Sequence, residues 1–251
     1  MGKGKNNEEL FRSMPVAQAI LTLAVPTVVS QIITIIYNMA DTFFIGQLGV
    51  PKQLAAATLA MPLFMFMTAL SNLFGVGGAS LISRFLGGGE REKASRCGAF
   101  CIWTAVAVSV LYGLMVLAGR PVLLPVLGAN EETCDMASSY LFWTIGLGAL
   151  PTVMNPALAH LIRSEGYSRQ ASLGVAFGGI LNMVLDPLFI YGLHLQITGA
   201  AVATLISNAT AMIYFLAFIW KMRGVSVLTL SPGMYTLGEH IPAEVISVGM
   251  P

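Results

Sequence analysis

Long apolar stretches dominate this chain of 251 residues and limit what it can fold into. A helix needs about 20 apolar residues to cross the hydrocarbon core of a bilayer. We identify six such stretches, which are residues 16–47, 53–83, 97–119, 136–162, 170–193 and 199–220. Only 10% of the residues are charged, against about 25% in an ordinary soluble domain. The chain is therefore predicted to be an all-α integral membrane protein, a bundle of six transmembrane helices.

The distribution of Lys and Arg predicts how the helices are oriented. If the N-terminus is cytoplasmic, the outer segments hold only Lys52 and Arg120. The cytoplasmic segments then hold the other eleven: Lys3, Lys5, Arg12, Arg84, Arg91, Lys93, Arg96, Arg163, Arg169, Lys221 and Arg223. Basic residues concentrate on the cytoplasmic side of membrane proteins. We therefore expect a multi-pass protein of the plasma (inner) membrane with a cytoplasmic N-terminus.

Four segments are expected along the chain. They are a cytoplasmic N-terminal segment (1–15), a six-helix transmembrane unit (16–223), a cytoplasmic linker (224–243) and the start of a seventh helix (244–251). VISVGMP at the end of the chain resembles ILTLAVP in the first span, with Pro251 on Pro26. Repeated halves are common in secondary transporters. We therefore expect a second six-helix half to follow this one.

Several function classes lack their signatures. The net charge of +1, without clustered basic and aromatic residues, argues against a nucleic-acid partner. Cys97 and Cys101 lie one helical turn apart and are expected to be small core residues, and no Cys/His spacing resembles a zinc site. GGGE at 87–90 lacks the Gly-Lys-Ser/Thr of a phosphate loop. We expect a protein that is not an enzyme, has no cofactor and draws energy from an ion gradient.

A polar stripe runs along the first span. Gln31, Thr34, Asn38 and Asp41 recur at steps of three or four residues, and Tyr37 precedes Asp41 by four. This spacing places them on one side of a helix. Interhelical hydrogen bonds, worth roughly 0.6 to 2 kcal/mol each, could account for Gln31 and Thr34. A carboxylate at mid-helix costs about 2.5–3.5 kcal/mol, so we expect a functional role for Asp41.

A second carboxylate lies in the fifth span. Asp186 is the only Asp, Glu, Lys or Arg between residues 170 and 220. Asn182 lies four residues earlier on the same face, and Pro187 is expected to kink the helix and free the carbonyl of Met183. Carboxylate, amide and carbonyl oxygens suit a hard cation such as Na⁺, or a proton.

Several motifs resemble one transporter family. NMVLDPLFI (182–190), followed by GAAVATLISN (199–208), is similar to a pattern of the multidrug and toxic-compound extrusion (MATE) transporters. PTVVSQIITIIYNMADTFFIGQLG, LISRFLGGGEREKA and NPALAHLIRSEGYSRQA resemble further parts of that family in the same order. The resemblance covers most of residues 15–220. It implies the N-terminal lobe of a twelve-helix, two-lobe transporter, with the second lobe as partner.

The resemblance also implies a site. In one prokaryotic branch of the family, a cation site consists of two aspartates, an asparagine and a threonine. The matching residues in this chain, with Na⁺ as a possible ligand, are Asp41, Asn182, Asp186 and Thr204. Tyr37 matches a tyrosine of the same cavity, and we expect Gln31, Thr34 and Asn38 beside it as substrate-cavity residues.

The function expected from this resemblance is secondary active antiport. The protein would export small organic drugs or toxic compounds, often cationic, in exchange for Na⁺ or H⁺. A lipid-linked saccharide flippase of the same superfamily is an alternative, but such proteins usually need cationic side chains in the cavity and no Lys or Arg lies mid-span. An intramembrane aspartyl protease also uses two carboxylates, but its Tyr-Asp and Gly-x-Gly-Asp motifs are absent. The sequence leaves the ion and the substrate open.

Overall fold

The structure is a computed structural model that describes residues 15–236 and 240–250. Its elements are α2 (Val16–Gln47), α3 (Pro51–Leu59), α4 (Met61–Gly87), α5 (Arg91–Val126), α6 (Glu131–Leu141), η1 (Phe142–Leu147), α7 (Ala149–Ser164), α8 (Ser168–Pro187), η2 (Leu188–Gly192), α9 (Gln196–Lys221), η3 (Pro232–Met234) and α10 (Ile241–Gly249). Within the described residues all of these elements are helical, which confirms the all-α prediction. The N-terminal segment predicted at 1–15 lies outside the described residues except for Pro15.

The predicted spans correspond to these helices. Five segments are long and apolar enough to cross a membrane, and α3 and α4 together form one of them. The fourth predicted span is bent: Glu131–Leu147 and Ala149–Ser164 meet at 47°. Counted as one span, this pair brings the number among the described residues to the predicted six.

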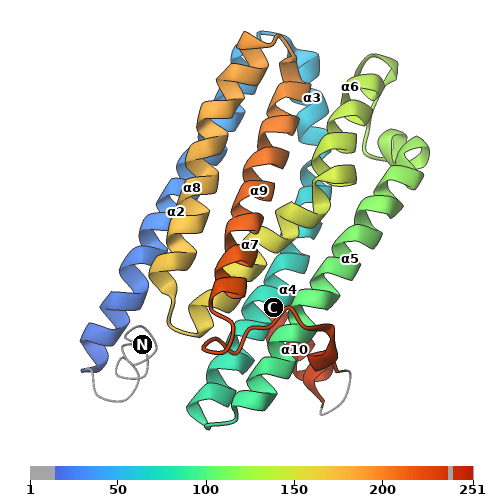
Figure 1. The fold of residues 1–251 in the computed structure, drawn as a ribbon. Coiled ribbons are helices and arrows are strands. Elements are labelled where there is room, and N and C mark those ends of the chain that lie inside the picture. The colour runs from blue at the N-terminus through green and yellow to red at the C-terminus, as the bar shows by residue number, and fades with distance from the viewer. Residues whose placement is uncertain (1–14, 237–239, 251) are drawn as a thin grey trace.

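The helices form an elongated bundle (Figure 1). At one edge α2 packs mainly against α8, and at the other α5 packs against α4 and α7. α7 lies inside the bundle and contacts α4, α5, α8 and α9. A large apolar cluster includes Phe74, Leu158 and Phe215, and a second one, built around α3, α4 and α6, includes Met67 and Leu141. The polar residues discussed below are therefore held by helices that pack directly on α7 and α8.

Glycines allow the closest helix contacts. A Cβ on Gly174 of α8 would overlap the ring of Phe215 on α9. A Cβ on Gly75 of α4 would lie 3.0 Å from the Cα of Ala157 on α7. Small residues are the usual means by which membrane helices approach each other.

The segment after α9 is bound to the bundle. The segment turns at Gly224, where φ is +84°. Beyond this turn it donates three hydrogen bonds to Glu165 in the α7–α8 loop. The donors are Ser226 Oγ and the amides of Val227 and Leu228, each 2.8 Å from Glu165 Oε1. Burial raises the pKa of Glu165 above the ordinary glutamate value, although these hydrogen bonds oppose the rise.

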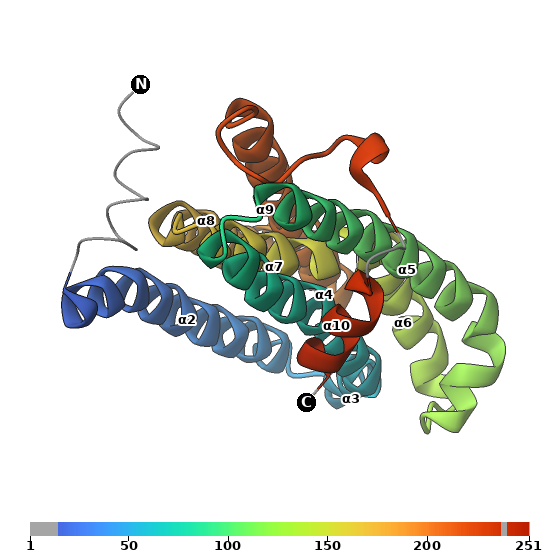
Figure 2. The same ribbon diagram turned by 90° about the horizontal axis from the view of Figure 1, so that it is seen from below.

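The described part of the predicted linker up to residue 236 follows the outside of the bundle. Viewed from below, it runs past α5 (Figure 2). The ring of Tyr235 stacks on Phe100 of α5, with 6.0 Å between ring centroids. α10, where the seventh helix was predicted to begin, packs on α4 so closely that a Cβ on Gly77 would lie 2.5 Å from the carbonyl oxygen of Val245.

Candidate functional site

The fifth span brings an amide and a carboxylate together. Asn182 and Asp186 are one turn apart on α8, and Asn182 Nδ2 donates to Asp186 Oδ1 over 3.1 Å. Both residues are buried, with exposed fractions of 3% and 0%. The same Nδ2 lies 3.5 Å from Thr204 Oγ1 on α9. Asp186 Oδ2 is buried and has no hydrogen-bond partner.

Asp41 supplies the second carboxylate from α2. Its Oδ1 is also buried without a hydrogen-bond partner. Asp41 is close enough to Asp186 for the two charges to repel each other. Two neighbouring carboxylates that each have a buried oxygen are not both stable as anions unless a cation or a proton joins them. The pair therefore has the chemistry of a site for a proton or a small cation.

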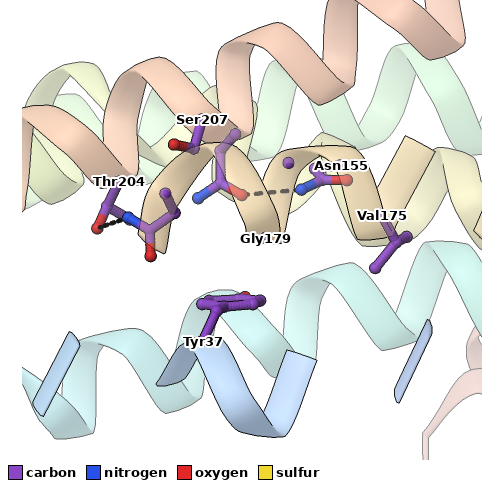
Figure 3. Close-up of a pocket in the computed structure, with 9 residues that line it drawn as sticks. Tyr37, Asn155, Val175, Gly179, Thr204 and Ser207 are labelled. Atoms are coloured by element: carbon purple, nitrogen blue, oxygen red, sulfur yellow. Dashed lines mark hydrogen bonds between the residues drawn. The ribbon is translucent and has the colours of Figure 1, made fainter. Parts of the chain in front are cut away.

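A small cavity lies beside Asn182 and Thr204, and neither Asp41 nor Asp186 is among the residues that line it. Its volume is about 20 Å³, which is enough for one water molecule or one small ion. It is lined by Tyr37, Asn155, Val175, Gly178, Gly179, Asn182, Thr204, Ser207 and Asn208. Figure 3 shows Tyr37 on one side of the cavity, facing Thr204, Ser207 and Asn155. The cavity thus lies where α2 meets α7, α8 and α9.

The residues predicted from the sequence do not all reach this cavity. Tyr37, Asn182 and Thr204 line it. Thr34 is half-buried and donates to the carbonyl of Ser30 within its own helix. Two others of the predicted stripe, Gln31 and Asn38, lie on the exposed side of α2.

A chain of amides in the cavity was not predicted from the sequence. Asn155 Nδ2 donates to Asn208 Oδ1 over 2.8 Å, and Asn208 Nδ2 donates to Thr152 Oγ1 over 3.2 Å. Asn155 Oδ1 is buried without a partner. A signal existed, because Asn155 and Asn208 are amides inside apolar spans, where polar side chains tend to face protein or a cavity.

Tyr140 is a further residue that the sequence did not reveal. It is buried on α6, in the bent fourth span, where its ring packs edge-on against that of Phe64 with 6.3 Å between ring centroids.

Pro187, where a kink was expected, is the last residue of α8, and the chain continues as the π-helix η2. A π turn spaces its hydrogen bonds one residue further apart than an α-helix, and such turns occur often at functional sites. The fifth span is therefore helical past the proline, up to Gly192, with a change of helix type directly after it.

The ligand set is rich in oxygen. Within residues 15–236 and 240–250, no three His, Cys, Asp or Glu side chains form a cluster of the kind that binds transition metals. The predicted set offers two carboxylates, one amide and one hydroxyl. These are ligands for a hard cation such as Na⁺, and the carboxylates can also take up a proton.

Comparison with known proteins gives consistent results. The MatE family model matches residues 26–188. The multidrug export protein MepA of Staphylococcus saprophyticus is 30% identical over 241 residues, which are 96% of this chain and 53% of that protein. The MepA protein of Staphylococcus aureus is 29% identical over the same shares. The chain therefore spans about half the length of these relatives.

Solved structures agree with this assignment. A MATE protein in complex with MaL6 superposes with a TM-score of 0.91 at 29% identity, over 100% of this chain and 54% of that one. A MOP superfamily transporter from Pyrococcus furiosus, described as having a binding pocket of reverse polarity, gives a TM-score of 0.87 at 29% identity, over 97% and 53%. From the family match and the helical architecture, we conclude that this chain belongs to the MatE family of membrane transporters.

Proposed function

We propose that this chain forms the first lobe of a cation-coupled antiporter that exports small organic compounds, often cationic ones. The relatives are named multidrug export proteins, and the chain spans about half of their length. The proposed activity is therefore that of the whole transporter, with a second six-helix lobe.

One observation carries the proposal: Asp186 is fully buried with an unpartnered Oδ2, and a second carboxylate, Asp41, also has a buried, unpartnered oxygen. A carboxylate inside a membrane bundle is costly to keep there. Structural hydrogen bonds could be made by neutral residues instead. An exchangeable cation or proton explains why both acids are present.

The proposed cycle uses occupancy of this pair. When the site faces outward, Asp41 and Asp186 take up Na⁺ or H⁺, which cancels their charge and weakens attraction for a cationic compound. When the site faces the cytoplasm, release of the ion restores the charge and attracts the next compound. One charge crossing 100 mV releases about 2.3 kcal/mol, which can drive accumulation against a gradient.

The flippase alternative would require cationic groups for an anionic headgroup. The lining of the described cavity contains amides, hydroxyls and a phenol but no Lys or Arg. Around the candidate ion site this lining therefore offers no positive charge to an anionic headgroup.

The test uses the full-length transporter containing this chain, reconstituted in liposomes. Efflux of a fluorescent organic cation is followed under an imposed Na⁺ gradient and, separately, under a pH gradient. We expect one gradient to drive efflux, and Asp186→Asn to abolish it. Asp135→Asn, on an exposed position of α6, is the matched control and should leave efflux unchanged.

Two results would count against the proposal. Full efflux by correctly inserted Asp186→Asn would mean that the coupling site lies elsewhere. An unmutated protein that is inserted but inactive under both gradients, while it moves a lipid-linked saccharide, would favour the flippase.

A further inference from the structure

α2 carries Tyr37 and Asp41 and is packed along one face only. Only 6% of its most apolar stretch is buried. It packs mainly on α8, with minor contacts to α3 and α9. The contacts along this one face therefore determine the rotation of α2 about its own axis.

The functional face of α2 also carries the residue that anchors it. Ser30, Thr34, Tyr37 and Asp41 follow each other at steps of four, three and four residues, so they share one face. Ser30 is fully buried, whereas its neighbours Gln31 and Ile32 are exposed. The rotation that buries Ser30 therefore also turns Asp41 toward α8.

Three helices meet at Ser30. Arg163, in the last turn of α7, donates from Nη2 to Ser30 Oγ over 3.1 Å. Ser172 of α8 has its Oγ 3.3 Å from the same atom. The Ser30 hydroxyl also bonds to the carbonyl of Thr27 in its own helix, over 2.8 Å. The side chain of Arg163 thus spans from α7 to α2.

A second contact holds the other end of the same face. Tyr191 of η2 donates from its hydroxyl to the carbonyl of Phe44 over 2.8 Å, three residues beyond Asp41. Between the two contacts, Gly179 of α8 makes room for a ring: a Cβ there would lie 2.7 Å from Cδ1 of Tyr37. Contacts at Ser30 and Phe44 therefore bracket Tyr37 and Asp41.

We propose that Arg163 is a positioning residue, which fixes the rotation of α2 through its hydrogen bond to Ser30 and so aims Tyr37 and Asp41 at α8. The importance of that aim for transport rests on the proposed function, but the positioning itself does not. Arg163 is in none of the ion pairs found among the described residues, and its Nε is buried without a partner. The bond to Ser30 is thus the one side-chain hydrogen bond that we find for its guanidinium within the described residues.

The first test measures the packing of α2 directly. Ile45, at the outer end of α2, is 3% exposed. No proline lies between Ser30 and Ile45, so a rotation at one should reach the other. The probe is the rate at which a small thiol reagent modifies Ile45→Cys in the membrane-inserted chain, with Cys134→Ser as background.

We expect Arg163→Ala and Ser30→Ala each to raise this rate by about tenfold, because each removes a hydrogen bond involving a charged group. The double variant should add little, since both changes remove the same contact. Arg169→Ala, an exposed arginine at the start of α8, should leave the rate unchanged. An unchanged rate in correctly inserted Arg163→Ala would overturn the proposal, as would additive effects of the two single variants.

A covalent substitute separates positioning from a general loss of stability. Ser30→Cys with Ser172→Cys replaces two side chains whose oxygens already lie 3.3 Å apart. In the Arg163→Ala background, the oxidised pair should return the modification rate of Ile45→Cys to its original value, and a reductant should reverse this. If the oxidised pair forms but leaves the rate high, Arg163 does not act by positioning α2.

The same variants are then assayed for efflux in the full-length transporter. Arg163→Ala should reduce efflux and the oxidised cysteine pair should restore it. The labelling results can follow the expected pattern while neither the unmutated protein nor any variant transports a compound. In that case the proposed function fails and the positioning role stands. Normal efflux in Arg163→Ala despite fast labelling would show that transport does not depend on this contact.

Discussion

Asn182 donates a hydrogen bond from Nδ2 to Oδ1 of Asp186, one turn further along α8, over 3.1 Å. The bond occupies one carboxylate oxygen and leaves Oδ2 unpartnered. It also places Thr204 Oγ1 beside the same amide. Three of the four predicted ligands are thus adjacent before any ion is considered.

The hydroxyl of Thr204 should contribute to ion affinity. Thr204→Val keeps the shape of the side chain and removes its oxygen. We expect the half-saturating concentration of the coupling ion to rise on the order of tenfold, the effect typical of a lost partner around a bound ion. Efflux measured against ion concentration in full-length transporter checks this. Thr204→Ser retains the hydroxyl and should behave normally, and an unaltered ion dependence in Thr204→Val would remove Thr204 from the site.

Packing at Gly174 should be intolerant of a methyl group. Gly174→Ala inserts a Cβ where the ring of Phe215 already lies. Overpacking of this kind costs about 1–3 kcal/mol, and thermal unfolding in detergent should occur at lower temperature. Gly46→Ala is the matched control in α2, because no atom lies within 4 Å of its added Cβ. Equal unfolding temperatures for the two variants would contradict the close approach of α8 and α9.

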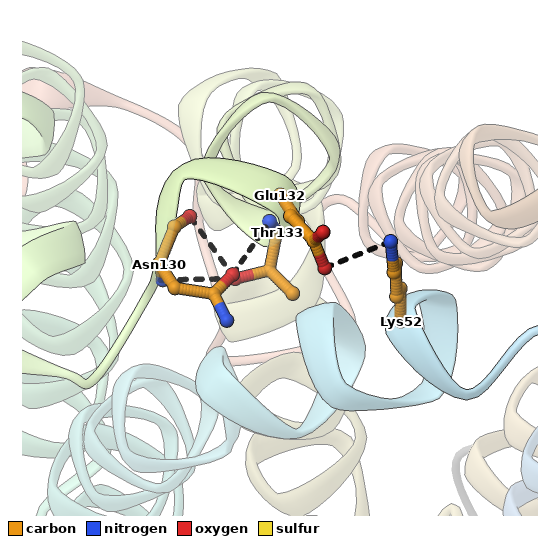
Figure 4. A network of polar contacts seen from close by, with 4 residues as sticks. All are labelled: Lys52, Asn130, Glu132 and Thr133. Atoms are coloured by element: carbon orange, nitrogen blue, oxygen red, sulfur yellow. Dashed lines mark hydrogen bonds and ion pairs between the residues drawn. The ribbon is translucent and has the colours of Figure 1, made fainter.

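Two polar contacts at the start of α6 should differ in how much they stabilise the protein (Figure 4). Asn130 caps the helix, accepting from the amide of Thr133 over 3.0 Å. Asn130→Ala should cost about 0.5–2 kcal/mol. Lys52 pairs with Glu132 at 2.8 Å, but the two side chains are 50% and 62% exposed, so Lys52→Met should cost only about 0–1 kcal/mol. Unfolding of the two variants, measured side by side, compares their losses of stability. A larger loss of stability for Lys52→Met than for Asn130→Ala would contradict this ranking.

The contact between Glu165 and the segment after α9 should depend on pH. Burial raises the pKa of Glu165 while the segment is bound, so the bound state holds a proton more tightly than a released, solvated Glu165. Protonation therefore favours binding. The segment should loosen as pH rises from the ordinary glutamate value through the raised pKa, and change little above it.

Modification of Leu228→Cys measures this opening, because Leu228 is 2% exposed. The rate is divided, at each pH, by the rate in a Glu165→Gln background, which removes the pH dependence of the thiol itself. A ratio that rises with pH agrees with looser binding of the segment to ionised Glu165. A flat or falling ratio would show that Glu165 does not link proton binding to this contact.

Spacing within one helix predicted part of the site well. The four-residue interval between Asn182 and Asp186 became a hydrogen bond, and the interval between Tyr37 and Asp41 placed both on the inner side of α2. The same reasoning included Gln31 and Asn38, which are exposed. Polar residues at helical spacing define one side of a helix, but the packing of the neighbouring helix determines which of them are buried.

Contacts between helices could not be predicted from the sequence. Asn155 and Asn208 are 53 residues apart, and nothing in either span indicates that they pair. The bend of the fourth span at Gly148 also went unpredicted, although Pro151 lies three residues beyond it and leaves the carbonyl of Leu147 without its helical N–H donor. Pro187 marked the place where the regular α-helix ends, but it did not indicate that the chain continues as a π turn.

The π turn at Leu188–Gly192 sets how this place responds to a change of chain length. A π turn holds one residue more than an α turn, so removing one residue here would let the turn rewind as an ordinary α-helix without rotating the helix before it. Within a regular helix such as α9 the same deletion would rotate every later residue of that helix by about 100°. The loss of one codon should therefore be less damaging in this turn than in the regular helices, as long as Tyr191, which bonds to the carbonyl of Phe44, is kept.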